Sequence, residues 1–120
     1  MIVVGICGSP RKAGNSEFIL NEALAVANER GFETNKLLLS EMQIDFCNDC
    51  GDCSKGRDCP KDDDMKRILA ALEKADGIIV ASPVYFGSIT GQLKALFDRT
   101  IPLRRRGSLL KNKAGCALSV

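Results

Sequence analysis

Residues 2–16 read IVVGICGSPRKAGNS, and this stretch decides the fold. Its first part, residues 2–6, is a continuous apolar and mostly β-branched run, which is typical of a strand buried on both faces of a parallel sheet. A polar loop with two glycines follows. The chain is then predicted to be helical from Ser16 to Arg30, with Asn15 or Ser16 as the N-cap and apolar residues at three- and four-residue steps. A buried strand, a loop and an amphipathic helix form the first unit of an α/β fold.

The same alternation continues along the chain. Further strands are predicted at residues 32–39, 77–81 and 114–120, and further helices from the acidic run 62–64 onward and over residues 90–99. The last helix is expected to turn three side chains inward: Leu93, Leu96 and Phe97. The resulting order, β-α-β-α-β-α-β, implies right-handed crossovers and a doubly wound parallel sheet with helices on both faces.

The composition is that of one globular domain covering residues 1–120. Hydrophobic residues make up 45% of the 120, and 17 basic side chains balance 15 acidic ones, which does not favour a nucleic-acid partner. No apolar run approaches the ~20 residues that span a bilayer, so no membrane association is expected. There is no histidine, which excludes Ser-His-Asp triads and His-ligated zinc. The N-terminus reads as a strand rather than a signal peptide, so a reducing, cytoplasmic location is expected.

The loop after the first strand, residues 7–16, has the composition of an anion site. In open α/β sheets, ligands bind beyond the carboxyl ends of the strands, where this loop lies. Its glycines allow close backbone approach, and the following helix start offers free N–H groups and a positive dipole end. The loop therefore predicts phosphate binding; the alternative is a polar turn that only caps the helix. The polar side chains available are Ser9, Arg11, Asn15 and Ser16.

The loop after the third predicted strand, residues 82–91, holds Tyr85 and Phe86, two of only six aromatic residues in the chain. They lie beside Pro83 and Gly87. Apolar, aromatic walls and accessible backbone groups suit a planar ligand. The alternative is that both rings pack on the neighbouring helix. Taken together, the two loops predict a flat ring that carries a phosphate.

Four of the six cysteines fall in a cysteine-rich loop at about residues 45–62: Cys47, Cys50, Cys53 and Cys59. Structural zinc usually takes two separated cysteine pairs. Three cysteines at steps of three, then a fourth followed by proline, resemble the cluster runs of ferredoxins, although the last gap is five residues here. The spacing favours a [4Fe–4S] cluster, with zinc, a disulfide or free thiols as the alternatives.

Two other features carry less information. Cys7 and Cys116 lie in or next to apolar strands, where buried free cysteine is common, and no role is assigned to them. The triplet 104–106, three arginines, is most simply a solvated surface; the alternative is a patch that steers an acidic electron-transfer partner.

Three segments together resemble one known family. GSPRKAGNS after the first strand, the compact cysteine run, and SPVYFGSITGQLKALFDR look like those of the iron-sulfur flavoproteins, a branch of the flavodoxin-like, NADPH-dependent FMN reductase superfamily. The resemblance covers essentially all of residues 1–120, and the cysteine run is its most specific feature. It implies a flavodoxin-like doubly wound sheet that apparently lacks the last strand and helix, because members of the family are longer.

The resemblance also implies cofactors and partners. The FMN phosphate would lie on Ser9, Arg11, Asn15 and Ser16. The ribityl chain and isoalloxazine would be lined by Pro83, Val84, Tyr85, Phe86 and Gly87. The [4Fe–4S] cluster would be held by Cys47, Cys50, Cys53 and Cys59. Ferredoxin or another small electron donor is the implied partner, and a homodimer or homotetramer the implied assembly.

Three functions are open at this point. The first is an oxidoreductase that moves electrons between a one-electron donor and an acceptor through cluster and flavin, the protein supplying position and tuning. The second is an NAD(P)H-dependent FMN or quinone reductase without a cluster. The third is a non-enzymatic electron carrier.

The fourth predicted strand, residues 114–120, would be an exposed and apolar sheet edge. Ala117, Leu118 and Val120 would lie in water there, which is costly for a small domain. We therefore expect that the native protein continues past Val120 or that a partner chain covers this edge.

Overall fold

A computed structural model describes residues 1–120 and contains a four-stranded parallel sheet. Two strands occupy its centre, β1 (Ile2–Cys7) and β3 (Gly77–Ser82), and two form its edges, β2 (Glu33–Leu38) and β4 (Ala114–Ser119), in the order β2-β1-β3-β4. All three neighbouring pairs are parallel. The doubly wound parallel sheet predicted from the alternating apolar runs is confirmed.

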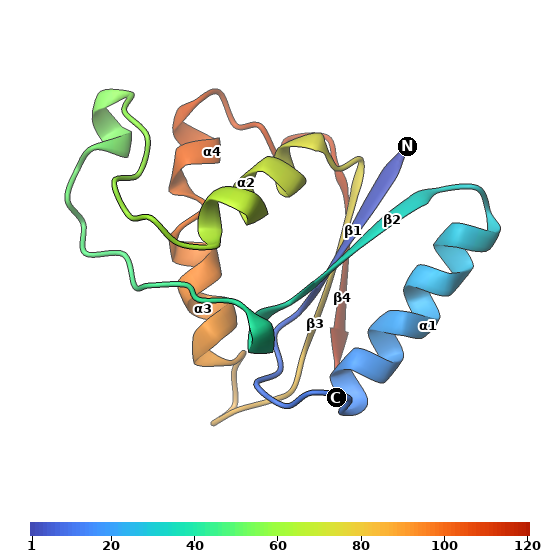
Figure 1. Cartoon of the computed structure of the whole chain (residues 1–120). Helices are drawn as coiled ribbons and strands as arrows, with labels where there is room; N and C mark the ends of the chain where they lie inside the picture. The colour runs from blue at the N-terminus through green and yellow to red at the C-terminus, as the bar shows by residue number, and fades with distance from the viewer.

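Helices cover both faces of the sheet (Figure 1). α1 (Asn15–Glu29) lies alone on one face, and α2 (Met65–Lys74), α3 (Gly91–Asp98) and α4 (Ile101–Arg105) lie on the other. The face with three helices holds the larger core, a cluster of 11 buried hydrophobic residues. The smaller cluster under α1 has four: Cys7, Leu20, Leu24 and Ala81. None of the helices is both long enough and apolar enough to cross a membrane.

Two local predictions about the helices are wrong. Gly14, with an extended backbone, is the N-cap of α1, because Asn15 and Ser16 already lie inside the helix. Phe97 does not face the core but is 41% exposed, whereas Leu93 and Leu96 are buried as expected. The period of α3 places Phe97 on the apolar side of the helix, but the ring lines the open cavity next to β3 and β4 and no other side chain covers it fully.

α4 has no counterpart among the predicted elements. Its sequence is IPLRR, and only Leu103 is buried, so no apolar period marks it as a helix. Pro102 lies in its first turn, where the missing N–H costs nothing. The arginine triplet therefore belongs partly to a helix that packs through a single leucine.

β4 is an exposed edge strand. It pairs only with β3, and five of its six residues are exposed. An open cavity of ≈ 750 Å³ lies beside it and is lined mostly by apolar side chains, with Phe97 and Leu110 on the helical side. That a further segment or a partner chain covers this edge stays a prediction.

Candidate cofactor-binding sites

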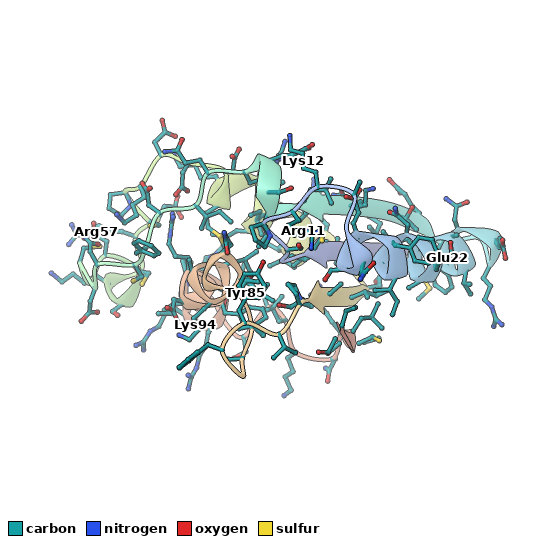
Figure 2. All side chains as sticks on the ribbon, turned by 90° about the horizontal axis from the view of Figure 1, so that it is seen from below. Arg11, Lys12, Glu22, Arg57, Tyr85 and Lys94 are labelled. Atoms are coloured by element: carbon teal, nitrogen blue, oxygen red, sulfur yellow. The ribbon has the colours of Figure 1, made fainter.

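The two loops predicted to bind a ligand lie side by side at the carboxyl edge of the sheet. β1 and β3 are adjacent and parallel, with Cys7 opposite Ala81, and the Gly8 N–H donates to the Ala81 carbonyl at 2.8 Å. Figure 2 looks onto this edge from below and labels Arg11 on the β1–α1 loop (residues 8–14) and Tyr85 on the β3–α3 loop (residues 83–90). Ligands of open α/β sheets bind at such an edge.

Thr90 ties these two loops together. Its side chain is completely buried, and its Oγ1 donates to the Gly8 carbonyl at 2.6 Å. The same Oγ1 accepts the Leu93 N–H at 3.2 Å and so caps α3, while the Thr90 N–H donates to Ser82 Oγ at 3.4 Å. Sequence reasoning missed this residue. A threonine just before a helix is a common N-cap signal, but nothing in the sequence indicates its bond to Gly8.

The four residues predicted to bind phosphate divide between the floor and the rim of the β1–α1 loop. Ser9 and Ser16 are buried, and Ser9 Oγ accepts the Arg11 N–H at 3.2 Å. Arg11 and Asn15 are exposed. The exposed Arg11 side chain is free to turn toward an anion, and the start of the 15-residue helix α1 faces the same loop.

Glu17 shapes the far side of the β1–α1 loop. Its Oε2 accepts the Ala13 N–H at 2.8 Å, and its Oε1 accepts from Lys36 Nζ at 3.0 Å. The Lys36 hydrogen bond, and then that of Ala13, lower the pKa of Glu17. Ala13 is held in the left-handed region at φ 52, which the Glu17 carboxylate stabilises. Lys36 also offsets a negative charge that would otherwise oppose anion binding here.

The β3–α3 loop presents its aromatic residues to solvent. Tyr85 and Ser88 exchange two backbone hydrogen bonds, at 2.8 and 3.0 Å, around a two-residue turn. Phe86 and Gly87 form that turn with φ of 50° and 75°, the geometry of a type I′ hairpin. Phe86 is fully exposed, Val84 and Tyr85 are 57% and 44% exposed, and Pro83 is partly buried. The alternative that the ring packs on the neighbouring helix is therefore wrong for Phe86.

The four clustered cysteines line one cavity. Cys47, Cys50, Cys53 and Cys59 surround a space of ≈ 100 Å³ in the cysteine loop (residues 45–62), and all four are free thiols. A short 3-10 turn at Cys53–Lys55 and the left-handed Gly51 and Gly56 fold the loop back on itself. No group of three His, Cys, Asp or Glu side chains is arranged to hold a metal ion.

The donor set nevertheless fits an iron–sulfur cluster in its chemistry. Four sulfur donors with no histidine select soft metals and Fe–S clusters. Three cationic side chains, Lys61, Arg99 and Arg105, line the same cavity and suit thiolates and an anionic cluster.

Arg99 and Asp63 form a buried ion pair beneath the cysteine loop. Both side chains are 3% exposed, and Arg99 Nη2 lies 3.1 Å from Asp63 Oδ1. Burial opposes ionisation of Asp63, but the Arg99 hydrogen bond and the N–H groups of Asp45 and Met65 outweigh it and lower the pKa of Asp63 to about 2. Sequence reasoning treated Asp63 only as a helix-start residue and did not single out Arg99. The helix instead begins at Met65, with Asp64 as its N-cap.

The remaining predicted features are the two cysteines outside the loop and the arginine triplet 104–106. Cys7 is buried, and burial raises the pKa of its thiol. Cys116 is exposed on β4, so the expectation of two buried cysteines is wrong for this one. Arg106 pairs with Glu73 at 3.3 Å, while Arg104 and Arg105 are exposed.

The family model described as NADPH-dependent FMN reductase matches residues 1–120. The chain belongs to the NADPH-dependent FMN reductase family. Within this family, an iron-sulfur flavoprotein of Methanosarcina thermophila is 52% identical over 120 residues, and one of Methanocaldococcus jannaschii is 45% identical over 120 residues. The resemblance read from the sequence motifs is confirmed. Each match covers 100% of this chain but only 63% and 62% of the relative, so the chain spans about three fifths of the length of these relatives.

Solved structures share the fold of this FMN reductase family member. A flavone reductase superimposes with a TM-score of 0.75 at 23% identity, over 99% of this chain and 43% of that chain. An NADH:FMN oxidoreductase superimposes with a TM-score of 0.63 at 22% identity, over 98% of this chain and 73% of that chain. At these identities the likeness concerns the fold alone, and the flavodoxin-like architecture is confirmed.

Proposed function

We propose that the protein is a flavin-dependent oxidoreductase that binds FMN between the β1–α1 and β3–α3 loops and a [4Fe–4S] cluster in the cysteine loop. The observation that carries the proposal is that four free thiols line one cavity in a chain whose β1–α1 and β3–α3 loops are joined by the hydrogen bond from Thr90 to Gly8. Full-length similarity to proteins named iron-sulfur flavoprotein supports it. When bound, the flavin exchanges one or two electrons and the cluster single electrons.

In this proposal the β1–α1 loop binds the FMN phosphate. Ser9 and Ser16 form the floor, and Asn15 and Arg11 close over the phosphate from the rim, Arg11 with a charge-assisted hydrogen bond. The start of α1 adds its N–H groups and dipole. No histidine or other acid–base group is assigned, because the protein supplies binding and orientation rather than proton transfer.

The β3–α3 loop lines the ribityl chain and the isoalloxazine. Five residues contribute: Pro83, Val84, Tyr85, Phe86 and Gly87. The exposed Phe86 and Tyr85 rings offer apolar area for a flat ligand. Thr90 fixes the separation of this loop from the phosphate-binding loop.

The cluster is tested by anaerobic purification followed by iron, sulfide and flavin analysis. We expect about four irons and four acid-labile sulfides per chain. Cys50→Ala should lose both, whereas Cys116→Ala, which changes an exposed cysteine outside the loop, should keep them. Stoichiometric zinc without sulfide would contradict the proposal.

The phosphate assignment is tested with Arg11→Ala. A charge-assisted hydrogen bond contributes about 1.5–3 kcal/mol, so the affinity for FMN should fall about tenfold or more. Riboflavin, which has no phosphate, should bind far more weakly than FMN. Lys12→Ala is the matched control, because Lys12 is the exposed neighbour of Arg11 and pairs with Glu41 at 3.7 Å. Equal affinity for FMN and riboflavin would contradict the assignment of the phosphate to this loop.

A cluster-free NAD(P)H-dependent FMN or quinone reductase is the second candidate. It is favoured by the arrangement of the thiols, of which no three are placed to hold one metal ion. Colour separates the candidates, since flavin alone gives a yellow protein and flavin with cluster a brown one. Steady-state turnover with a reductant and an acceptor separates either enzyme from a non-enzymatic electron carrier.

Ferredoxin or another small one-electron donor is the proposed partner, and a homodimer or homotetramer the proposed assembly. The exposed β4 edge and its apolar cavity are compatible with further contacts on that side. Sedimentation of the purified protein tests the assembly. Reduction of the protein by ferredoxin, compared with reduction by NAD(P)H, tests the donor.

A further inference from the structure

Arg99 contacts the cysteine loop at its two ends and at one thiol. Its Nη1 donates to the Asp45 carbonyl at 3.1 Å, its Nη2 donates to Asp63 Oδ1 at 3.1 Å, and the same Nη2 lies 3.6 Å from Cys59 Sγ. Asp45 is the first residue of the loop, and Asp63 follows its last. One side chain from the end of α3 therefore joins the two ends of the loop beneath the cavity that the four cysteines line.

These contacts are shielded from water and fully partnered. Arg99 and Asp63 are both 3% exposed, and Asp63 also accepts the N–H groups of Asp45 at 2.8 Å and Met65 at 3.1 Å. Removing one partner of such a pair leaves a buried charge and is strongly destabilising. The outer ion pair of the loop, Arg57 with Asp52, is 3.8 Å long and its arginine is largely exposed. Exposed pairs contribute little, so of these two ion pairs that of Arg99 holds the loop more strongly. It acts beside the direct hydrogen bonds between the two ends, from the Asp45 N–H to Asp63 and between Gln43 and Asp64.

We propose that Arg99 is a positioning residue for the cluster: it closes the two ends of the cysteine loop and donates an N–H···S hydrogen bond to Cys59 that raises the reduction potential of the bound cluster. The inference rests on the cluster of the proposed function. It concerns a residue that is itself neither a ligand nor part of the FMN site.

The direction of the change in reduction potential follows from the charges of the cluster and of Arg99. Reduction adds a negative charge to the cluster, and hydrogen bonds to its sulfurs tune the potential at which this occurs. A guanidinium with an N–H near a ligating sulfur stabilises the more negative, reduced state. Loss of that contact should therefore make the cluster harder to reduce. A purely structural anchor would change cluster retention but not the potential of the clusters that remain.

Arg99→Lys and Arg99→Gln separate the anchoring role from the tuning of the potential, with Arg104→Gln as control. Lysine keeps a charge for Asp63, but its single ammonium does not reproduce the planar fork that reaches Asp45, Asp63 and Cys59 together. Glutamine removes the charge. Arg104 is an exposed arginine of α4 that does not line the cavity, so its replacement removes one positive charge nearby without touching the anchor.

Three measurements test whether Arg99 anchors the loop and tunes the reduction potential. Iron and sulfide contents report retention, and a redox titration followed by electron paramagnetic resonance reports the midpoint potential. Limited trypsin digestion of cluster-free protein reports anchoring, because Lys55 and Arg57 are exposed cleavage sites inside the loop. We expect Arg99→Gln to lose more than about half of its iron and to be cleaved roughly tenfold faster or more in the loop. Arg99→Lys should retain more iron but show a more negative potential, and Arg104→Gln should match the wild type in retention and cleavage.

The outcomes distinguish this inference from the proposed function. Wild-type protein without iron and sulfide overturns the proposed function and, with it, the tuning of the potential; faster cleavage of Arg99→Gln would still support the anchor. Wild-type protein with a cluster, together with Arg99 variants of unchanged potential, overturns the tuning role. Unchanged iron content and unchanged cleavage in those variants overturn the anchor.

Discussion

Replacing Thr90 by valine tests whether one hydroxyl fixes the relation between the two loops of the proposed FMN site. Valine has nearly the shape of threonine, so the substitution removes the hydroxyl and keeps most of the packing. Thr90 is completely buried. Its Oγ1 donates to the Gly8 carbonyl and accepts the Leu93 N–H. Because bulk water does not reach this position, neither group finds a replacement partner.

The expected loss of stability is about 2–4 kcal/mol. Loss of a side-chain N-cap costs about 1 kcal/mol, and a buried carbonyl left without its donor costs about 1–3 kcal/mol. For a domain of 120 residues, 1 kcal/mol corresponds to roughly 4 °C in Tm. The Tm of Thr90→Val should therefore fall by roughly 8–16 °C, and FMN should bind more weakly because the two loops are no longer tied.

Thermal unfolding by circular dichroism and FMN titration by fluorescence quenching measure the two effects. Thr90→Ser keeps the hydroxyl and loses one methyl group, at a cost of about 1 kcal/mol. Thr100→Val removes an exposed hydroxyl that donates to the Phe97 carbonyl at 2.7 Å, and should cost less than about 1 kcal/mol. If Thr90→Val melts within about 3 °C of Thr90→Ser, the hydroxyl does not hold the loops and the reasoning is refuted.

Two further predictions concern the core and the buried ion pair. Gly5→Ala should destabilise the protein by about 1–3 kcal/mol, because the new Cβ would lie 2.8 Å from Leu24 Cδ1 under α1; Gly115→Ala, where the Cβ meets nothing within 4 Å, should be nearly neutral in the same urea titration. The low pKa of Asp63, about 2, predicts stability that is fully present above about pH 4 and is lost as the pH falls toward 2, by about 2 kcal/mol. Urea unfolding of wild type and Asp63→Asn between pH 6 and pH 2 tests this, and an equal pH dependence in the two proteins would exclude Asp63 as its source.

The order of the elements could be predicted because it depends on local patterns. The apolar runs at 2–6 and 77–81 mark the two central strands, since a parallel strand buried on both faces needs a continuous rather than an alternating pattern. The same strands place their loops at one edge, so the two candidate ligand-binding loops could be predicted as neighbours. Where the pattern is weak, as in α4 with a single buried leucine, the element was missed.

The exposure of Phe97 and Cys116 could not be predicted from the periodicity of apolar residues in the sequence. Phe97 has the spacing of an inward-facing residue on α3, yet it is 41% exposed. Periodicity indicates which side of a helix is apolar, but it does not indicate whether an open cavity lies next to that side. Cys116 is exposed for a related reason, since β4 has a neighbour on one side only.

The residues that hold the candidate sites together were missed because their partners are distant in sequence. Thr90 and Gly8 are 82 positions apart, and Arg99 and Asp63 are 36 apart. Each looks unremarkable locally: a threonine before a helix, an arginine after one. Motifs gave the candidate ligand-binding residues, whereas the side chains that support them depend on which loops the fold brings together.

α3 explains why both supporting residues belong to the same short segment. Thr90 immediately precedes it and bonds to the β1–α1 loop, and Arg99 immediately follows it and bonds to the cysteine loop. Eight helical residues between them span about 12 Å, and the buried Leu93 and Leu96 fix the helix in the core. The helix is therefore a rigid spacer whose two ends hold the two candidate cofactor sites. Its two cap residues make the contacts that link the sites, although neither is itself among the predicted ligands.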